Sequence, residues 1–413
     1  MSLPRSEARF PSRSQLLLFG LIMALAVAEI GLRLIGYSYP EFYKTDLSRG
    51  YSLRPGMQGF YRKEGKSFVR INSEGLRDRE HDKAKPPNTI RIALLGDSYA
   101  EALQVPMVDA FWSVMERDLD QCVSSSGKKV EVINFGVSGY GTAQELITLR
   151  EHVWDYAPDI VLLAVTTNND ITDNSRALKK TDDIPYFVYR DGQLVLDDSF
   201  KQSRDVVWRQ SKLALISEWF YDHSRSMQVT SEAYRGFKVF LTSLPSEFRL
   251  VPKSGLVSNM PGPALLDRSV ELGIDNFVYS EPANQIWDDA WRVTEGLIKT
   301  MRDDVKSREA RFVVVTLSNG AQVLPSPAQR AAYMRGFGIT DLFYPDRRIK
   351  ALGDREGFEV ITLAPEMQSY AEHNGVTLHG IGSTLGFGHW NTNGHRVAGE
   401  LLARKLCESG LVK

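Results

Sequence analysis

The sequence predicts an α/β fold in which a five-stranded parallel sheet lies between two layers of helices. Three observations lead to this prediction. Short apolar runs alternate with amphipathic segments, which is the order of strands and crossover helices. The first run ends abruptly in Gly96, Asp97 and Ser98. The alternation breaks at Thr166 and resumes near Asn284, so a large insertion divides the core. The expected strands are residues 90–95, 130–134, 160–165, 312–317 and 359–363.

Length and composition narrow the class of protein. The 413 residues suffice for a substantial core and a second unit. A formal net charge of -1, with no cluster of Lys and Arg among aromatic residues, argues against a nucleic-acid surface. Cys122 and Cys407 are too few for a disulfide-built scaffold and have the wrong spacing for a zinc site, so we expect no metal and no other cofactor. Each lies near the C-terminal end of an expected helix, so they form either a disulfide or two buried thiols.

The amino terminus resembles an export signal. Arginines precede an apolar run at residues 16–28, and Glu29 and Arg33 can pair on one helix face beyond it. We expect residues 15–37 to anchor the chain in the inner membrane, with residues 1–14 in the cytoplasm and the rest in the periplasm of a Gram-negative-like cell. One alternative is a cleaved signal peptide, because Ala26-Val27-Ala28 fits a cleavage site, and another is a buried helix of a cytosolic protein.

The remaining chain divides by pattern. Residues 38–88 are rich in Tyr, Gly, Pro and charge, and we expect them to form a stem that wraps the core. The core itself comprises residues 89–173 and 285–413. Residues 174–284 are too many for an ordinary loop. Because this insertion leaves the carboxyl end of a core strand, we expect it to form a lid or substrate wall over the active edge.

The insertion has recognisable elements. Residues 185–196 predict a β-hairpin on an Asp191-Gly192 turn, which supplies the positive φ angles that two-residue turns need. A helical stretch follows. We expect its aromatic residues to form a small core rather than a sugar platform; they are Trp208, Trp219, Phe220 and Tyr221.

Candidate catalytic residues follow the expected strands. Ser98 comes directly after the first strand, where a serine can react, although Gly-Asp-Ser alone is also a common turn. Gly139 lies in a glycine-rich loop that can bring backbone N–H groups to a substrate oxygen. Asn169, before Asp170, can donate its amide to an oxyanion or simply cap a turn. His389 precedes the last helix and can accept a serine proton.

Together these segments resemble the four sequence blocks of the SGNH (GDSL-type) hydrolase family, in the family's order. The resemblance implies a flavodoxin-like fold and acyl transfer through a serine ester. Ser98 would be the nucleophile and His389 the base, and the Ser98 N–H, Gly139 and Asn169 would form the oxyanion hole. Supporting roles would fall to Asp97, Asp170 and Asn391. The apolar amino terminus, the 71–78 segment and the His-Trp-Asn ending resemble a membrane-anchored bacterial branch.

One departure concerns the histidine. The family usually carries an aspartate three residues before it, and this sequence has Gly386 there. Phe387 occupies the position that relatives acetylating alginate use instead. No acidic residue lies between Glu372 and His389, so a backbone carbonyl or a carboxylate from elsewhere must orient the imidazole.

Three functions are compatible with these residues. The first is an exported serine esterase that removes acyl groups, most plausibly acetyl, from a cell-envelope or exopolysaccharide substrate. The second is an O-acyltransferase that uses the same residues, with a sugar hydroxyl in place of water and partners in polysaccharide biosynthesis. The third is a glycan-binding protein that kept the fold and lost the chemistry, which the missing aspartate favours.

Overall fold

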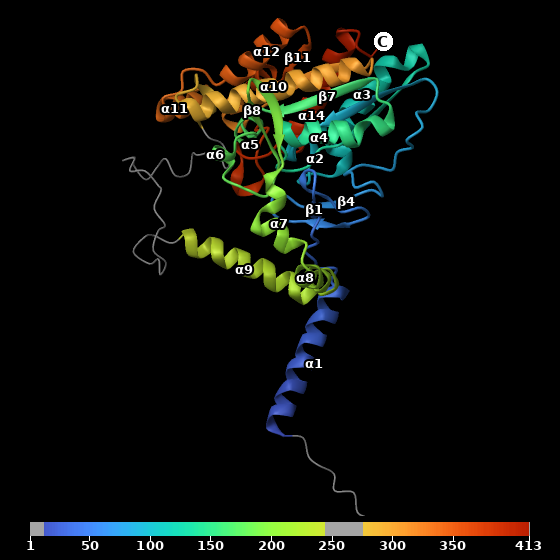
Figure 1. Ribbon diagram of the computed structural model, residues 1–413, viewed down its shortest axis with the longest axis vertical. Helices are drawn as coiled ribbons and strands as arrows, with labels where there is room; N and C mark the ends of the chain where they lie inside the picture. The colour runs from blue at the N-terminus through green and yellow to red at the C-terminus, as the bar shows by residue number, and fades with distance from the viewer. Residues whose placement is uncertain (1–11, 244–275, 413) are drawn as a thin grey trace, which may run out of the picture. The chain divides into compact units, whose positions relative to one another are not determined.

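The computed structural model describes residues 12–243 and 276–412, except for the side chains of residues 238–243 (Figure 1). Most of the expected cytoplasmic segment and part of the expected insertion, residues 244–275, lie outside the described residues. The described chain forms two compact units. One comprises residues 12–41 and 211–243, and the other comprises residues 42–210 and 276–412.

The larger unit is built on a five-stranded, all-parallel sheet, as expected. The strand order is β11-β10-β7-β5-β6, which is the flavodoxin-like order 2-1-3-4-5 counted along the sheet's own strands. The strands formed where uninterrupted β-branched and apolar residues can be buried on both faces. Their bounds are β5 (Thr89–Leu95), β6 (Lys129–Asn134), β7 (Ile160–Thr166), β10 (Arg311–Leu317) and β11 (Glu359–Thr362).

Helices cover both faces of this sheet. Successive residues of a strand point to opposite faces, so Ile92 and Leu94 join one buried cluster while Ala93 and Leu95 join the other. The first cluster is covered by α3 (Phe111–Val123), α13 (Ala364–Asn374) and α14 (Thr392–Glu408); the second is covered by α4 (Thr142–Glu151), α10 (Gln285–Ser307) and α12 (Tyr344–Glu356). The shorter helices are α2 (Ser98–Glu101), α5 (Asn169–Asp173), α6 (Arg176–Lys179), α7 (Arg204–Arg209) and α11 (Pro327–Phe337).

The segment expected as a stem forms two small antiparallel hairpins. These are β1 (Tyr43–Asp46) with β2 (Gly50–Leu53), and β3 (Gln58–Tyr61) with β4 (Ser67–Arg70). They share a third buried cluster with the loops that follow β5 and β6, through Leu103, Val137 and Tyr140. This packing brings the β3–β4 turn to the carboxyl edge of the sheet.

The first part of the insertion contains the predicted hairpin. β8 (Tyr186–Arg190) pairs with β9 (Gln193–Asp197). Asp191 and Gly192 adopt φ angles of 50° and 77°, the left-handed conformation that such a turn requires.

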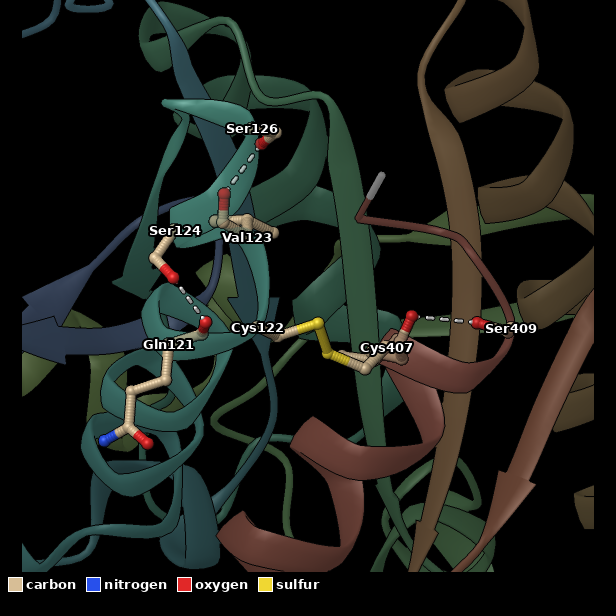
Figure 2. The surroundings of a disulfide bond; sticks show 8 residues. Gln121, Cys122, Val123, Ser124, Ser126, Cys407 and Ser409 are labelled. Carbon is tan, nitrogen blue, oxygen red and sulfur yellow. Dashed lines mark hydrogen bonds between the residues drawn. A yellow bond between two sulfur atoms is a disulfide. The ribbon is translucent and has the colours of Figure 1, made fainter.

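The two cysteines are joined in a disulfide, which decides between the two expectations (Figure 2). Cys122 lies in the last turn of α3 and Cys407 in the last turn of α14, and their Cα atoms are 6.5 Å apart. These two helices pack side by side and end at the edge of the sheet where its strands begin. The disulfide therefore lies at the edge of the sheet opposite the candidate active site.

The smaller unit contains α1 (Arg13–Leu34), α8 (Lys212–His223) and α9 (Arg225–Ser243). Within the described chain, α1 is the one helix long and apolar enough to cross a membrane, and none of its residues is buried. The expected aromatic core of the insertion is wrong. Trp208, Trp219 and Phe220 are 57, 55 and 53 % exposed, because the helices that carry them pack through other faces.

Candidate active site

The candidate site lies at the carboxyl ends of β5, β6 and β7, where the strand order reverses. In open parallel sheets this crevice is where ligands bind. Ser98 begins α2 just after β5, Gly139 lies in the loop after β6, and Asn169 begins α5 just after β7. His389 comes from the loop before α14. All four residues line one cavity of about 590 Å³.

Ser98 is placed by a buried carboxylate beside it. Asp97 is fully buried and caps α2 by accepting the N–H of Tyr99 at 3.0 Å. It also accepts the Thr166 hydroxyl at 3.0 Å and the Asn169 amide at 2.8 Å. Asp97 thus ties the end of β7 to the serine loop, which leaves Ser98 at the cavity with 8 % of its surface exposed.

The His389 imidazole reaches the serine directly. Its Nε2 lies 2.8 Å from the Ser98 Oγ, which is hydrogen-bonding distance for a base and its nucleophile. Asn391 holds the loop by capping α14, since its Oδ1 accepts the Gly394 N–H at 3.1 Å. The Asn391 amide also donates to the Thr377 carbonyl at 3.0 Å.

The carboxylate that orients His389 is Glu64, a residue that sequence reasoning missed. It lies in the turn between β3 and β4, and its Oε2 is 2.5 Å from the His389 Nδ1. Its Oε1 accepts the His389 N–H at 3.2 Å. Because Nδ1 donates to the carboxylate, the neutral ring presents Nε2 as an acceptor to Ser98. The three side chains form a continuous Ser–His–Glu array.

Glu64 and His389 shift each other's pKa. Burial opposes the charged form of Glu64, but its hydrogen bond to His389 outweighs burial and lowers the pKa of the carboxyl. Burial likewise disfavours the charged His389, but the hydrogen bond and charge of Glu64 outweigh it and raise the pKa of the imidazole. The array therefore stabilises an imidazolium, as a general base requires.

The backbone explains why no aspartate precedes the histidine. Gly386 has a φ of 95°, a left-handed conformation in which an aspartate would be strained. A Cβ atom there would also lie 3.0 Å from the Leu324 side chain. The left-handed conformation at Gly386 therefore favours glycine over aspartate at this position, and the carboxylate comes from Glu64 instead.

A second histidine fixes the loop that carries the first. His379 is buried, and its Nδ1 donates to the Gly388 carbonyl at 2.6 Å. The Ser318 hydroxyl lies 3.0 Å from its Nε2 and accepts the Trp390 indole N–H at 2.8 Å. Burial lowers the pKa of His379 to about 4, so it stays neutral. The residues on both sides of His389 are thereby held in place.

The glycine loop is shaped by the β1–β2 hairpin. Gly139 has a φ of 78°, and a Cβ atom there would lie 2.6 Å from the Tyr51 hydroxyl. That hydroxyl donates to the Ser138 carbonyl at 2.9 Å. The Ser138 N–H donates to buried Glu101 at 2.5 Å, so this loop is anchored on both sides.

Asp170 supports the neighbouring loops and does not line the cavity. It is fully buried, and its carboxylate accepts the Thr142 hydroxyl at 2.9 Å and the Thr166 N–H at 2.7 Å. Burial raises the pKa of this group well above its usual range. Asp170 therefore joins the start of α4 to the end of β7, next to Asn169.

The walls of the cavity come from outside the sheet. Tyr43, Tyr61 and Lys63 contribute one side from the stem hairpins, and Leu178 and Lys179 contribute another from α6. The insertion thus supplies part of the wall. Within residues 12–243 and 276–412, no group of His, Cys, Asp or Glu side chains is arranged to hold a metal ion.

Comparison with known proteins adds structural likeness at low similarity. No family model and no curated protein matches the chain. An acetyl xylan esterase, AlAXEase, is 12 % identical with a TM-score of 0.35, covering 77 % of this chain and 100 % of its own. LAE5, an alpha/beta hydrolase enzyme from the metagenome of Lake Arreo, Spain, is 11 % identical with a TM-score of 0.35, covering 78 % and 96 %.

A catalytic variant of Axe2, an acetylxylan esterase from Geobacillus stearothermophilus, is 10 % identical with a TM-score of 0.34, covering 77 % of this chain and 94 % of its own. At TM-scores this low, nothing about the activity of this chain follows from the likeness.

Proposed function

We propose that this protein is an exported, membrane-anchored serine esterase of the SGNH type, with Ser98, His389 and Glu64 as its catalytic residues. The observation that carries the proposal is the array itself. One imidazole contacts the Ser98 Oγ at 2.8 Å and a Glu64 carboxylate oxygen at 2.5 Å, at the lip of a cavity. This is the geometry of nucleophile, base and orienting acid.

The chemistry proceeds in two balanced halves. The Ser98 Oγ attacks the ester carbonyl as its proton passes to the His389 Nε2, and Glu64 stabilises the imidazolium. The imidazolium then gives that proton to the leaving alcohol, which leaves an acyl-Ser98 ester. In the second half, water attacks the acyl group with His389 again as base, releasing the acid and restoring Ser98.

Stabilisation of the oxyanion falls to the loops after the three strands. The Ser98 and Gly139 N–H groups and the Asn169 amide would receive the negative charge that develops on the carbonyl oxygen. Asn169 donates one amide proton to Asp97, which fixes the amide plane and leaves its second proton for the substrate.

The substrate class follows from the cavity and the compartment. Tyr43, Tyr61, Lys63 and Lys179 give the walls the aromatic and hydrogen-bonding character that suits an acylated sugar. The disulfide Cys122–Cys407 is typical of an oxidising compartment such as the periplasm. α1 would hold the protein in the inner membrane. We therefore propose an acetyl ester of a cell-envelope component or exopolysaccharide as the substrate.

Acyl transfer to a sugar hydroxyl is the second candidate. The observation that favours it is the pair of added walls, because the stem and α6 can shield an acyl-Ser98 from water. The binding-only alternative loses its main support, since Glu64 supplies the carboxylate that the sequence lacks near His389.

The decisive experiment is active-serine labelling of the full chain in detergent with a fluorophosphonate probe, followed by mass spectrometry. We expect labelling at Ser98, its absence in Ser98→Ala, and strong loss in His389→Ala. A folded protein with an unlabelled Ser98 would contradict the proposal. Unlabelled protein from the same preparation is then incubated with an O-acetylated oligosaccharide and a sugar acceptor. An esterase releases acetate, whereas a transferase acetylates the acceptor.

A further inference from the structure

The helices α8 and α9 have their apolar residues on the outside. On α8, Leu213, Ile216 and Phe220 recur at helical spacing, and Trp219 lies beside them. All four side chains are between 53 and 67 % exposed.

The same pattern appears on α9. Met227, Tyr234 and Phe237 share one exposed face, since they are seven and three residues apart. The opposite face carries Gln228, which is buried and accepts the Tyr39 N–H at 3.0 Å. α9 therefore packs through a polar group, and both helices present apolar side chains to the outside.

α8 and α9 form a helical hairpin, and two charged residues attach this hairpin to the end of α1. Glu29 accepts the N–H groups of Arg225 and Ser226 at 2.9 and 2.8 Å, which caps the start of α9. Arg33 pairs with Glu29 at 2.8 Å and donates to the His223 carbonyl at 2.6 Å, which caps the end of α8. The junction between the two helices is thus held at the Glu29–Arg33 turn.

That turn sets the depth of the hairpin. It follows directly on the exposed apolar body of α1, and charged residues at the end of a span lie at the headgroup level. One helical turn rises about 5 Å, so the start of α9 is within a few ångströms of the last lipid-facing residues. Figure 1 shows α9 running across the end of α1 rather than along it.

We propose that α8 and α9 lie in the outer interfacial layer of the membrane that α1 spans, with their exposed apolar faces in the lipid. This inference rests on the membrane anchor of the proposed function. Lipid fits the surface because the exposed apolar side chains of α8 and α9 are joined at the Glu29–Arg33 turn to the end of the exposed apolar helix α1, and because aromatic and aliphatic side chains above a polar face are typical of interfacial helices. The exposed Lys212, at the start of α8, suits anionic headgroups.

Site-directed spin labelling tests this in the full chain, reconstituted into vesicles of phosphatidylethanolamine and phosphatidylglycerol. Because both native cysteines are in the disulfide, an introduced cysteine is the single free thiol. The probe sites are Ile216→Cys on α8 and Tyr234→Cys on α9. The matched control is Arg235→Cys, one residue further along α9, which lies on the same polar face as Gln228 but keeps its side chain exposed. Ile22→Cys reports on α1.

We expect the labels at positions 216 and 234 to be several-fold more accessible to oxygen than to a water-soluble nickel complex, relative to the label at position 235. Equal nickel accessibility at 216, 234 and 235, with position 22 protected, would overturn the hairpin proposal and leave the anchor standing. Labels at 216 and 234 shielded from both reagents would overturn it in favour of a protein partner or second copy. Nickel access at position 22 would remove the anchor as well, while labelling of Ser98 judges the esterase separately.

Discussion

The two halves of the candidate site come from different kinds of structure. Ser98, Gly139 and Asn169 stand directly after buried strands, so the sheet places them. Glu64 stands on a turn between two four-residue strands of the stem, and only the packing of that stem brings it to His389. Ser98, Gly139 and Asn169 are thus positioned by the buried sheet, whereas Glu64 is positioned by a small hairpin of the stem.

This difference teaches that orientation of the base can be separated from the core that carries the nucleophile. In this chain 325 residues of sequence separate Glu64 from His389. The loop before α14 is free to be shaped by glycine and by His379, because it need not carry an acid. In the proposed mechanism the stem therefore supplies the orienting carboxylate as well as a wall of the cavity.

The largest effect is expected from His389→Ala, in the loop that the core positions beside Ser98. Loss of the base should lower the rate of Ser98 labelling and of ester hydrolysis by about 10⁴-fold or more, because the His389 Nε2 is the group that contacts the Ser98 Oγ to accept its proton. The rates are measured with the probe and with an activated acetyl ester. His395→Asn is the control, since His395 is buried against Phe111 away from the cavity. Comparable loss in a folded control would contradict a role specific to His389.

Glu64→Gln tests the stem side and should lower the same rates by about 10³-fold. The amide cannot stabilise the imidazolium, and it can favour the wrong tautomer of His389. Lys66→Gln is the matched control, because Lys66 is an exposed residue on the same turn. Thermal unfolding of both variants checks that the hairpin is intact. Full activity in Glu64→Gln would show that Ser98 and His389 work as a pair and that the stem is only a wall.

The core was predictable because its signals are local. The sheet strands are apolar runs, and the observed bounds, such as Ile160–Thr166, follow the predicted ones closely. The convergence of Ser98, Gly139 and Asn169 on one cavity follows from their places after the strands, and His389 joins them from the loop before α14. Those parts of the structure needed only strand order and the loops that follow it.

Glu64 was not predictable for a physical reason. The stem has no periodic pattern, and a contact between its turn and a distant loop depends on tertiary packing through residues such as Leu103 and Val137. The sequence signalled only that a carboxylate was missing, through Gly386. The exposed aromatic residues Trp219 and Phe220 were misjudged because an apolar helix face looks the same whether protein or lipid covers it.

Asn169→Ala should have a smaller effect than either change to the array. Removing one oxyanion donor lowers kcat by about 10²-fold, while the Ser98 and Gly139 N–H groups remain. The Asn169→Ala change also leaves one oxygen of Asp97 without its donor. Asn169→Ser serves as the second variant, because a hydroxyl can still donate, whereas Asn169→Asp would place a second carboxylate beside Asp97. Steady-state kinetics with an acetyl ester should show the loss in kcat with little change in KM. A loss confined to KM would assign Asn169 to substrate binding.

The smallest effect, a displaced pH profile, separates the two halves most directly. The active base is neutral His389, so kcat/KM should rise with pH through the pKa of this imidazole. Burial favours the neutral ring, but Glu64 outweighs burial and holds that pKa above its usual value of 6.5. In Glu64→Gln the opposing charge is gone and burial remains, so the residual activity should rise at lower pH than in the native protein. The profile of Lys66→Gln should match the native one. A rise that stays in place in Glu64→Gln would show that Glu64 does not set the ionisation of His389, even if its removal slows the reaction.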